Sequence, residues 1–455
     1  MPDALIAGLS QQRLMRVRAR ERETYLAAHP QCIGAAARSS EHWLNGVPMH
    51  WMTDWALPVP LVVKQAREAV LEDIDGHLYA DFCLGDTGSM FGHSPPAIAK
   101  ALAEQAQHGL TCMLPSEATA HAGELLAQRF GLPFWQMTQT ATDANRAVLR
   151  WARALTGRKK ILVFDGCYHG SLEDTLVHLD RGRVASRPGQ VGQIADFASH
   201  ARVVEFNDLS ALESELAHGD VACLLAEPVM TNAGMVLPQP EFWSHARELC
   251  DCFGSLLAID ETHTLSSGPG GHAKSIGLRA DFLIAGKAIA GGVPCAVYGF
   301  TSELAIRMSQ FLQDKPSGHS GMGTTLAANM LAIAALVACL QHVMTDDAYL
   351  HMNSLAGRLT QDLEQIIRSN SLPWHLTRVG ARIELCFTST PARTARESLN
   401  AGSPLIEQAL HLYLLNRGVL VTPFHNMMLI SPATSIEQVK KLLTAFADCI
   451  DELLT

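Results

Sequence analysis

Two charged residues each follow a short apolar segment, and together they could serve one kind of chemistry. Residues 256–259 run into Asp260, and residues 282–286 run into Lys287. Continuous apolar runs of this length are typical of buried parallel strands, whose carboxyl ends meet at one edge of a sheet where ligands bind. A carboxylate and an amine at that edge are what a pyridine aldehyde needs, because one can pair with its ring nitrogen and the other can form a Schiff base.

The segments that would position these residues alternate between strand and helix from about residue 95 to residue 330. Helical patterns such as Ala141–Leu155 and Phe242–Phe253 separate many of the apolar runs. This alternation predicts an α/β fold with a mainly parallel sheet flanked by helices. The candidate strands are Lys160–Phe164, Ala201–Val204, Val221–Ala226, Leu256–Ile259, Phe282–Ala285 and Ala296–Phe300.

The chain is predicted to have three parts. Residues 1–94 begin with a helix over 4–29, continue as an irregular loop over 30–60, and reach an extended pair over 71–82 whose Asp75-Gly76 step predicts a hairpin turn. We expect this segment to join the small domain and to make dimer contacts. Residues 95–330 would form the large, cofactor-binding domain. Residues 331–455 would form a small α+β domain with helices over Leu331–Val343, Leu350–Ser369, Leu405–Arg417 and Ile436–Leu454.

Composition narrows the class of protein. The 455 residues are 48% hydrophobic and 18% charged, which indicates a globular protein with more than one domain. The net charge of −10 gives no reason to expect nucleic acid or an anionic membrane as a partner. No apolar run reaches the roughly 18 residues of a membrane span. The cysteines and histidines lack metal-ligand spacing, so no metal site is expected, and the absence of a signal peptide favours the cytoplasm.

Five motifs, taken in order, carry a resemblance to a known family. The chain resembles the class III aminotransferases of fold type I, which depend on pyridoxal 5'-phosphate (PLP), over roughly residues 60–450. Within them it is most similar to the branch that holds glutamate-1-semialdehyde aminomutase and the β-amino-acid transaminases. The motifs are Thr138–Asn145, Tyr168-His169-Gly170, Glu227-Pro228-Val229, Asp260–His263 and Gly286-Lys287.

The resemblance implies a role for four residues around the cofactor ring. Lys287 would form the Schiff base and carry the proton between the substrate carbon and the cofactor. Asp260 would pair with the ring nitrogen and keep it protonated, which makes the ring a better electron sink. Tyr168 would stack on one face of the ring, and Thr262 would lie against the other.

Three residues near this ring leave alternatives open. Thr262 and His263 depart from the family, which usually carries valine followed by glutamine or methionine. His263 could donate to the cofactor phenolate oxygen, or it could simply complete the wall of the site. Glu227 follows another strand and faces the same crevice, where support of the ring or of Asp260 is favoured over proton transfer.

The cofactor phosphate is predicted to bind at Thr140-Ala141-Thr142. This loop precedes the helix 143–155, and a helix N-terminus offers free amide groups and a favourable dipole. Ala141 stands where the family usually has glycine. The resemblance implies a second anchor from the neighbouring subunit, a threonine four residues before an asparagine, which is Thr325 before Asn329. A homodimer with composite active sites follows from that expectation.

The substrate is less constrained than the cofactor. Many relatives hold a substrate carboxylate with an arginine in a C-terminal segment, but Thr422 stands at that position. The remaining candidates are Arg38, which we assign to the substrate carboxylate, and Arg382; either could instead be a surface arginine.

Three functions fit these residues. The first is an aminotransferase that moves an amino group from an amino acid or amine donor to a 2-oxo acid by a ping-pong mechanism. The second is an aminomutase or racemase of the glutamate-1-semialdehyde aminomutase type. The third is a PLP-binding protein without transaminase turnover.

Overall fold

The computed structural model describes residues 4–313, 315–316, 320–422 and 425–455, and the chain forms two compact units. The larger unit contains Pro96–Tyr349 and Ala392–Leu399. The smaller unit contains Met1–Pro95, Leu350–Pro391 and Asn400–Thr455. The sequence placed the second boundary near residue 330, whereas the units divide at 349/350, because helix α10 (Met330–Ala338) packs against α3 (Pro96–Gln105) and α4 (Ala118–Phe130) of the larger unit.

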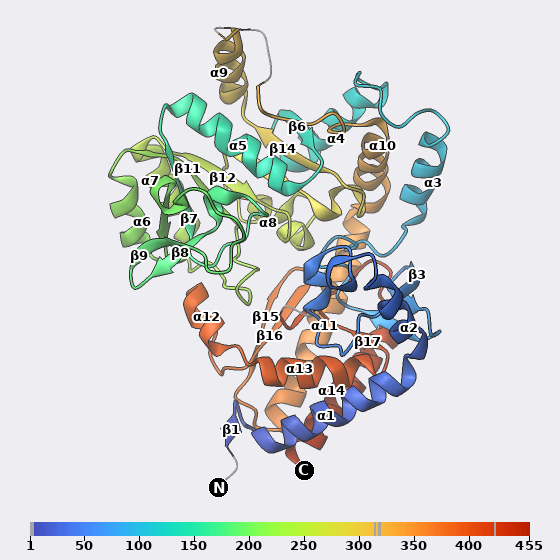
Figure 1. Cartoon of the computed structure of the whole chain (residues 1–455). Helices are drawn as coiled ribbons and strands as arrows, with labels where there is room; N and C mark the ends of the chain where they lie inside the picture. Colours follow the sequence, from blue (N-terminus) through green and yellow to red (C-terminus); the bar gives the residue numbers. More distant parts are fainter. Residues whose placement is uncertain (1–3, 314, 317–319, 423–424) are drawn as a thin grey trace. The chain divides into compact units, whose positions relative to one another are not determined.

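A seven-stranded sheet organises the larger unit (Figure 1). Its strand order is β10-β7-β11-β12-β13-β14-β6, and the first five strands run parallel. Strand β14 is antiparallel to both of its neighbours. The predicted α/β fold with a mainly parallel sheet is confirmed. The strands are β6 Phe134–Thr138, β7 Lys160–Phe164, β10 Ala201–Val204, β11 Val221–Ala226, β12 Leu256–Asp260, β13 Phe282–Ala285 and β14 Ala296–Phe300.

Helix α5 (Ala141–Thr156) lies across this sheet, against β11, β12, β13 and β14. Its Ala144, Val148, Trp151 and Ala152 are buried at helical spacing, so one apolar face covers the strands. The other helices of this unit are α6 Leu209–Leu216, α7 Phe242–Phe253, α8 Gly271–Ser275, α9 Ser302–Gln313 and the short helices η3 Glu173–Thr175, η4 Phe197–His200, η5 Thr264–Ser267, η6 Lys287–Ala290 and η7 Cys339–Val343. The hairpin β8 Val177–Asp180 and β9 Arg183–Ser186 completes it.

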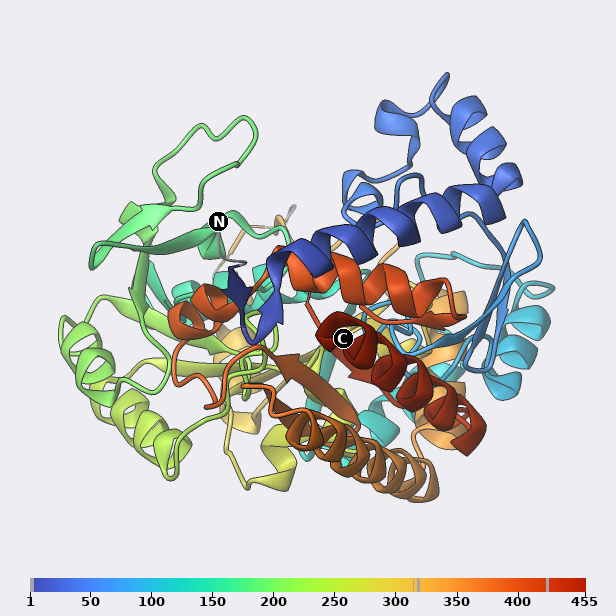
Figure 2. The same cartoon turned by 90° about the horizontal axis from the view of Figure 1, so that it is seen from below.

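The smaller unit combines short sheets with long helices. One sheet has the order β17-β5-β4-β3, a second has β15-β16-β18, and β1 pairs with β2. The long helices α1, α13 and α14 pack alongside one another (Figure 2). The elements are β1 Leu5–Ile6, β2 Leu9–Ser10, α1 Gln11–Ala28, α2 Pro30–Ser39, η1 Leu44–Gly46, η2 His50–Thr53, β3 Val63–Arg67, β4 Val70–Asp73, β5 Leu78–Asp81, α11 Asp346–Ser369, β15 His375–Val379, β16 Arg382–Cys386, α12 Ala395–Ala401, α13 Pro404–Leu415, β17 Val419–Leu420, β18 Met427–Leu429 and α14 Ile436–Leu454, with α11 and α12 extending across the unit boundaries.

Several local predictions differ from the structure. Residues 30–39 form α2 rather than an irregular loop, with Pro30 in the first turn, where its fixed φ suits a helix. The helix expected over 4–29 begins only at Gln11, after a small hairpin. Strand β6 lies where no strand was predicted. The hairpin predicted at Asp75-Gly76 is confirmed by the antiparallel pairing of β4 with β5.

One polar cluster in the smaller unit has the residue types of a metal site. His29, Asp73 and His77 place one ligand-type atom each within 4.8 Å of one another. These atoms are already hydrogen-bonded: Tyr79 donates to Asp73 at 2.7 Å, and His77 Nδ1 lies 3.0 Å from the same oxygen. The cluster therefore links α1 and α2 to the β4–β5 hairpin.

In the described part of the chain, no single helix is long and apolar enough to cross a membrane, and only the bent pair of helices 330–343 and 346–369 meets the length and composition test jointly.

Candidate active site

Three neighbouring parallel strands bring three polar residues to one edge of the large sheet. Strand β11 is followed by Glu227, β12 ends at Asp260, and β13 is followed by Gly286 and Lys287. The register pairs Ala226 with Ile259 and Asp260 with Ile284, so the three strands end at nearly the same level. The amino-acid sequence predicts this arrangement because each apolar run stops where its strand stops.

Asp260 is held by three donors at the end of β12. Its Oδ2 accepts from Asn145 Nδ2 at 2.9 Å and lies 3.0 Å from His169 Nδ1, and its Oδ1 accepts from the Thr262 amide at 3.1 Å. Burial alone would raise the pKa of Asp260, but the hydrogen bond and charge of His169 outweigh it and lower that pKa to about 2. The carboxylate is therefore ionised throughout the physiological range.

His169 is the buried partner of this carboxylate. Burial disfavours its charged form, yet the adjacent Asp260 raises the pKa of the imidazole. The two groups thus stabilise each other as an ion pair. Sequence reasoning attached no role to His169, although the Tyr-His-Gly motif marked its position. Asn145, which donates to Asp260 from α5, had no predicted role beyond its place in the motif Thr138–Asn145.

Lys287 has an unusual backbone. Its φ is +48°, in the left-handed region that residues with a side chain adopt infrequently and that tends to occur at functional sites. The residue opens η6, and its Nζ lies 2.6 Å from His263 Nε2. His263 was expected to reach a cofactor oxygen or complete the site wall; in the structure it contacts the lysine amine.

The predicted phosphate loop forms the N-terminus of α5. Thr140 is its N-cap and accepts from the Asp143 amide at 3.2 Å, so the amides of Ala141 and Thr142 stand at the helix start, where no intrahelical acceptor exists. A side chain added at Gly286 would lie 2.9 Å from the Ala141 methyl carbon. Because Gly286 has no side chain, the alanine that replaces the family's glycine fits directly beside the turn that carries Lys287.

The two residues predicted to flank the ring differ in exposure. Tyr168 is 43% exposed in the loop after β7. Thr262 is buried, and among the described residues its Oγ1 has no hydrogen-bond partner. A second close contact supports this loop: a side chain on Gly170, whose φ is +83°, would collide with Thr142, so the Tyr-His-Gly turn packs on the first turn of α5.

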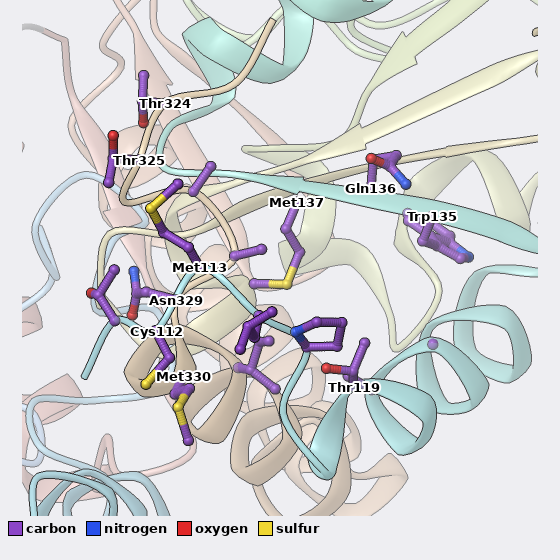
Figure 3. A pocket seen from close by; sticks show the side chains of 18 of the residues that line it. Cys112, Met113, Thr119, Trp135, Gln136, Met137, Thr324, Thr325, Asn329 and Met330 are labelled. Carbon is purple, nitrogen blue, oxygen red and sulfur yellow. The ribbon is translucent and has the colours of Figure 1, made fainter. Parts of the chain in front are cut away.

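Thr325 lines a hollow of about 410 Å³ (Figure 3). Thr324 and Thr325 line it just before α10, whose N-cap is Asn329, and Met113 and Met137 add apolar walls. Neither Asp260 nor Lys287 is among the lining residues. Thr325 itself is exposed.

The carboxylate candidates lie in the smaller unit. Arg38 is exposed near the end of α2. Arg382 is 1% exposed on β16 and donates to Thr87 Oγ1 at 2.9 Å, so it is a buried residue rather than a surface arginine. Thr422 is buried, and its amide donates to Met427 O at 3.2 Å. Its neighbours 423–424 lie outside the described residues.

One contributor had no sequence signal. Thr231 lies in the irregular segment between β11 and α7, held by the β-bridge between Met230 and Val236. Its hydroxyl contacts both Glu227 and His263 Nδ1. Nothing in the local sequence distinguishes it from an ordinary loop threonine.

Comparison of the sequence and structure with known proteins identifies the family of this chain. Residues 51–450 match the family model of the class-III aminotransferases. The chain belongs to that family. A glutamate-1-semialdehyde aminomutase from Pseudomonas aeruginosa PAO1 has 48% identity and a TM-score of 0.96, covering 98% of this chain and 100% of that one.

Two further similar structures are transaminases. A β-phenylalanine aminotransferase from Variovorax paradoxus has 25% identity and a TM-score of 0.85, covering 96% of this chain and 97% of that one. An omega-transaminase from Sphaerobacter thermophilus has 26% identity and a TM-score of 0.87, covering 94% of this chain and 100% of that one. The fold is therefore fold type I, and PLP is the cofactor of this class-III enzyme.

The residues at the sheet edge fit PLP. A carboxylate offers about four acceptor positions, and Asp260 uses three, which leaves one for a ring N–H. The half-exposed ring of Tyr168 and the first-turn amides of α5 would supply a stacking surface and an anion site. The donor set matches the three features of the cofactor: ring nitrogen, ring face and phosphate.

Proposed function

We propose that the chain is an aminotransferase that moves an amino group from an amino acid or amine donor to a 2-oxo acid by a ping-pong mechanism. The observation that carries this proposal is the pairing of an ionised, triply hydrogen-bonded Asp260 with Lys287 on neighbouring strands. Bound PLP supplies an electron sink for the substrate carbon. Two structures similar to this chain are a β-phenylalanine aminotransferase and an omega-transaminase, which supports this choice.

Each residue then has a defined task. Lys287 Nζ holds the cofactor and takes up and returns a proton at the substrate carbon. Asp260 keeps a positive charge on the ring nitrogen, and His169 and Asn145 hold Asp260 in place. Tyr168 and Thr262 orient the ring, while Thr140, Ala141 and Thr142 bind the phosphate. A solved variant of the 48%-identical relative in which lysine is replaced by alanine contains PMP, which supports the assignment of Lys287.

A homodimer with composite sites belongs to the same proposal. Large apolar side chains near the hollow that contains Thr325 are exposed: Met113 is 77%, Leu114 is 72% and Leu326 is 50% exposed. Burial of such side chains against a second copy would stabilise a dimer and would let Thr325 reach the phosphate of the cofactor in the partner subunit.

We also propose a cytoplasmic location, supported by free cysteines throughout the described residues.

A second candidate is an aminomutase of the glutamate-1-semialdehyde type. It is favoured by the 48% identity to a protein of that description over nearly the whole of both chains. In a transaminase the product leaves between the half-reactions, whereas in an aminomutase it stays and takes the amino group back at a different carbon.

A donor panel separates the two. We expect amino acids or amines to convert the visible spectrum of the PLP-loaded protein to the pyridoxamine form without an oxo acid present, and to release one oxo product per site. Addition of a 2-oxo acid should restore the original spectrum. If no donor releases a product, and glutamate-1-semialdehyde is instead isomerised with no acceptor, the aminomutase is the correct assignment.

Arg38 is proposed to bind the substrate carboxylate. For carboxylate donors, Arg38→Ala should raise KM by about 10- to 100-fold with a smaller change in kcat, since a charged hydrogen bond of roughly 1.5–3 kcal/mol is lost. Arg22→Ala, an exposed arginine on α1, is the control and should leave KM unchanged. An unaltered KM in Arg38→Ala would place the clamp elsewhere, with Arg382 as the next residue to replace.

A further inference from the structure

A buried chain of hydrogen-bonding groups leads away from Lys287. Lys287 Nζ lies 2.6 Å from His263 Nε2, and His263 Nδ1 contacts Thr231 Oγ1. The Thr231 hydroxyl and amide both donate to Glu227 Oε2, the amide at 3.3 Å. The groups come from the ends of β11, β12 and β13 and from the loop after β11. His263, Thr231 and Glu227 are 8%, 1% and 5% exposed.

The number of protons available determines which group donates in each of these hydrogen bonds. A carboxylate has no proton to give, so the single hydroxyl proton of Thr231 points to Glu227. The Thr231 oxygen is then an acceptor, and His263 Nδ1 must carry a proton to donate to it. In neutral His263 the remaining nitrogen, Nε2, is therefore unprotonated where it faces Lys287. The hydrogen bond on one ring nitrogen selects the tautomer at the other.

We propose that Glu227, Thr231 and His263 form a proton relay that accepts a proton from Lys287 and returns it. In the transfer, an Nζ–H bond of the lysine ammonium breaks and an Nε2–H bond of His263 forms. The positive charge moves from lysine to imidazole, and Glu227 stabilises it through Thr231; its nearest oxygen is 3.6 Å from His263 Nδ1. Lys287 keeps a free electron pair for attack on an aldehyde or removal of a substrate proton. His263 acts on the reaction through Lys287, so it is a positioning and relay residue.

Other charged groups near His263 have partners of their own. Asp260 is bonded to Asn145 and His169, and Glu261 accepts from Thr264 and from the amides of α8. On α8, which packs against η5, Lys274 Nζ donates to Arg129 O, and Tyr349 from α11 donates to Leu265 O. Glu227 and Lys287 both approach His263: a Glu227 oxygen lies 3.6 Å from Nδ1, and Lys287 Nζ lies 2.6 Å from Nε2.

The relay rests on the proposed attachment of PLP at Lys287, and a spectroscopic titration tests it. The PLP-loaded protein is titrated with alkali, and the midpoint pH of the change in its visible band is recorded. Glu227→Gln removes the carboxylate that favours positive charge on the Lys287–His263 pair, and Thr231→Val removes the acceptor of His263 Nδ1. Each should lower the midpoint by about one pH unit, because a hydrogen bond to a charged group is lost.

Matched variants make the test specific. The double variant Thr231→Val, Glu227→Gln should shift the midpoint no further than Glu227→Gln alone, since one chain is broken in both. Thr231→Ser, which restores the hydroxyl, should return it to the wild-type value. Thr264→Val removes a hydroxyl from the second buried threonine–glutamate pair, Thr264–Glu261, and should leave the midpoint unchanged.

The outcomes separate the relay from the function on which it rests. The relay is wrong if the midpoint is unchanged in both single variants. It is also wrong if Glu227→Gln shifts the midpoint and Thr231→Val does not, because the carboxylate would then act through space rather than through Thr231. A visible band that persists in Lys287→Ala would instead overturn the cofactor attachment. If Glu227→Gln folds poorly, the comparison of Thr231→Val with Thr231→Ser is sufficient: a lowered midpoint in the valine variant alone supports the relay, and equal midpoints overturn it.

Discussion

Replacement of Lys287 by alanine is expected to abolish the visible absorbance band of the PLP-loaded protein and to lower turnover by at least about 10³-fold. The lysine amine is assigned two tasks, holding the cofactor and moving the substrate proton, and general acid–base catalysis alone contributes about 10²–10⁴-fold. The substitution replaces the aminobutyl side chain by a methyl group on a backbone with φ of +48°. Alanine and lysine both carry a Cβ, so this backbone conformation costs them about the same and the fold should be retained. The measurement is the absorbance spectrum together with the single-turnover rate.

Chemical trapping gives this prediction a second readout. Borohydride reduction of the wild-type protein should attach the cofactor irreversibly to the peptide that contains Lys287, as mass spectrometry would detect. Lys287→Arg keeps the positive charge but not the nucleophilic amine, so it should behave like the alanine variant. Reduced cofactor found on a different lysine would show that the assignment to Lys287 is wrong.

Asp260→Asn is expected to reduce the single-turnover rate by about 10²–10³-fold while the cofactor stays bound through lysine and phosphate contacts. The size follows from the loss of a preorganised charge that stabilises the electron-rich transition state. The substitution also leaves the buried His169 without its charge partner, so the pKa of His169 should fall. Retention of a rate within a fewfold of wild type would contradict the ring-nitrogen assignment.

Two controls refine this result. Asp281→Asn changes an aspartate just before β13, at the opposite edge of the sheet, where it pairs with Arg247; it should lower thermal stability and leave the rate unchanged.

The pH dependence of the rate provides the second control. A lowered pKa means that ionised Asp260 persists down to about pH 2, so the acid limb of the wild-type rate profile should not report its protonation.

Local sequence patterns predicted most of the strands that position the site. Strands β7, β10, β11, β12, β13 and β14 are buried on nearly every residue, so most of them appear as a continuous apolar run whose end marks the sheet edge. Asp260 and Lys287 could be placed from that signal alone. Strand β6 was missed because its residues alternate between exposed and half-buried and the run is not apolar throughout. Helix α2 was missed because tryptophans and prolines dominate the segment around it.

The amino-acid sequence by itself determined the strands of the large sheet other than β6 and the hairpin at Asp75-Gly76, since each depends on neighbours a few positions away. The tertiary structure alone decided which groups surround the residues at the sheet edge. His169 and Asp260 are 91 positions apart, and Thr231 and His263 are 32 apart, so their contacts exist only because strand order and loop path bring them together. Burial then fixed their chemistry: with water excluded, the nearest polar group determines which of them carries charge and where each proton points.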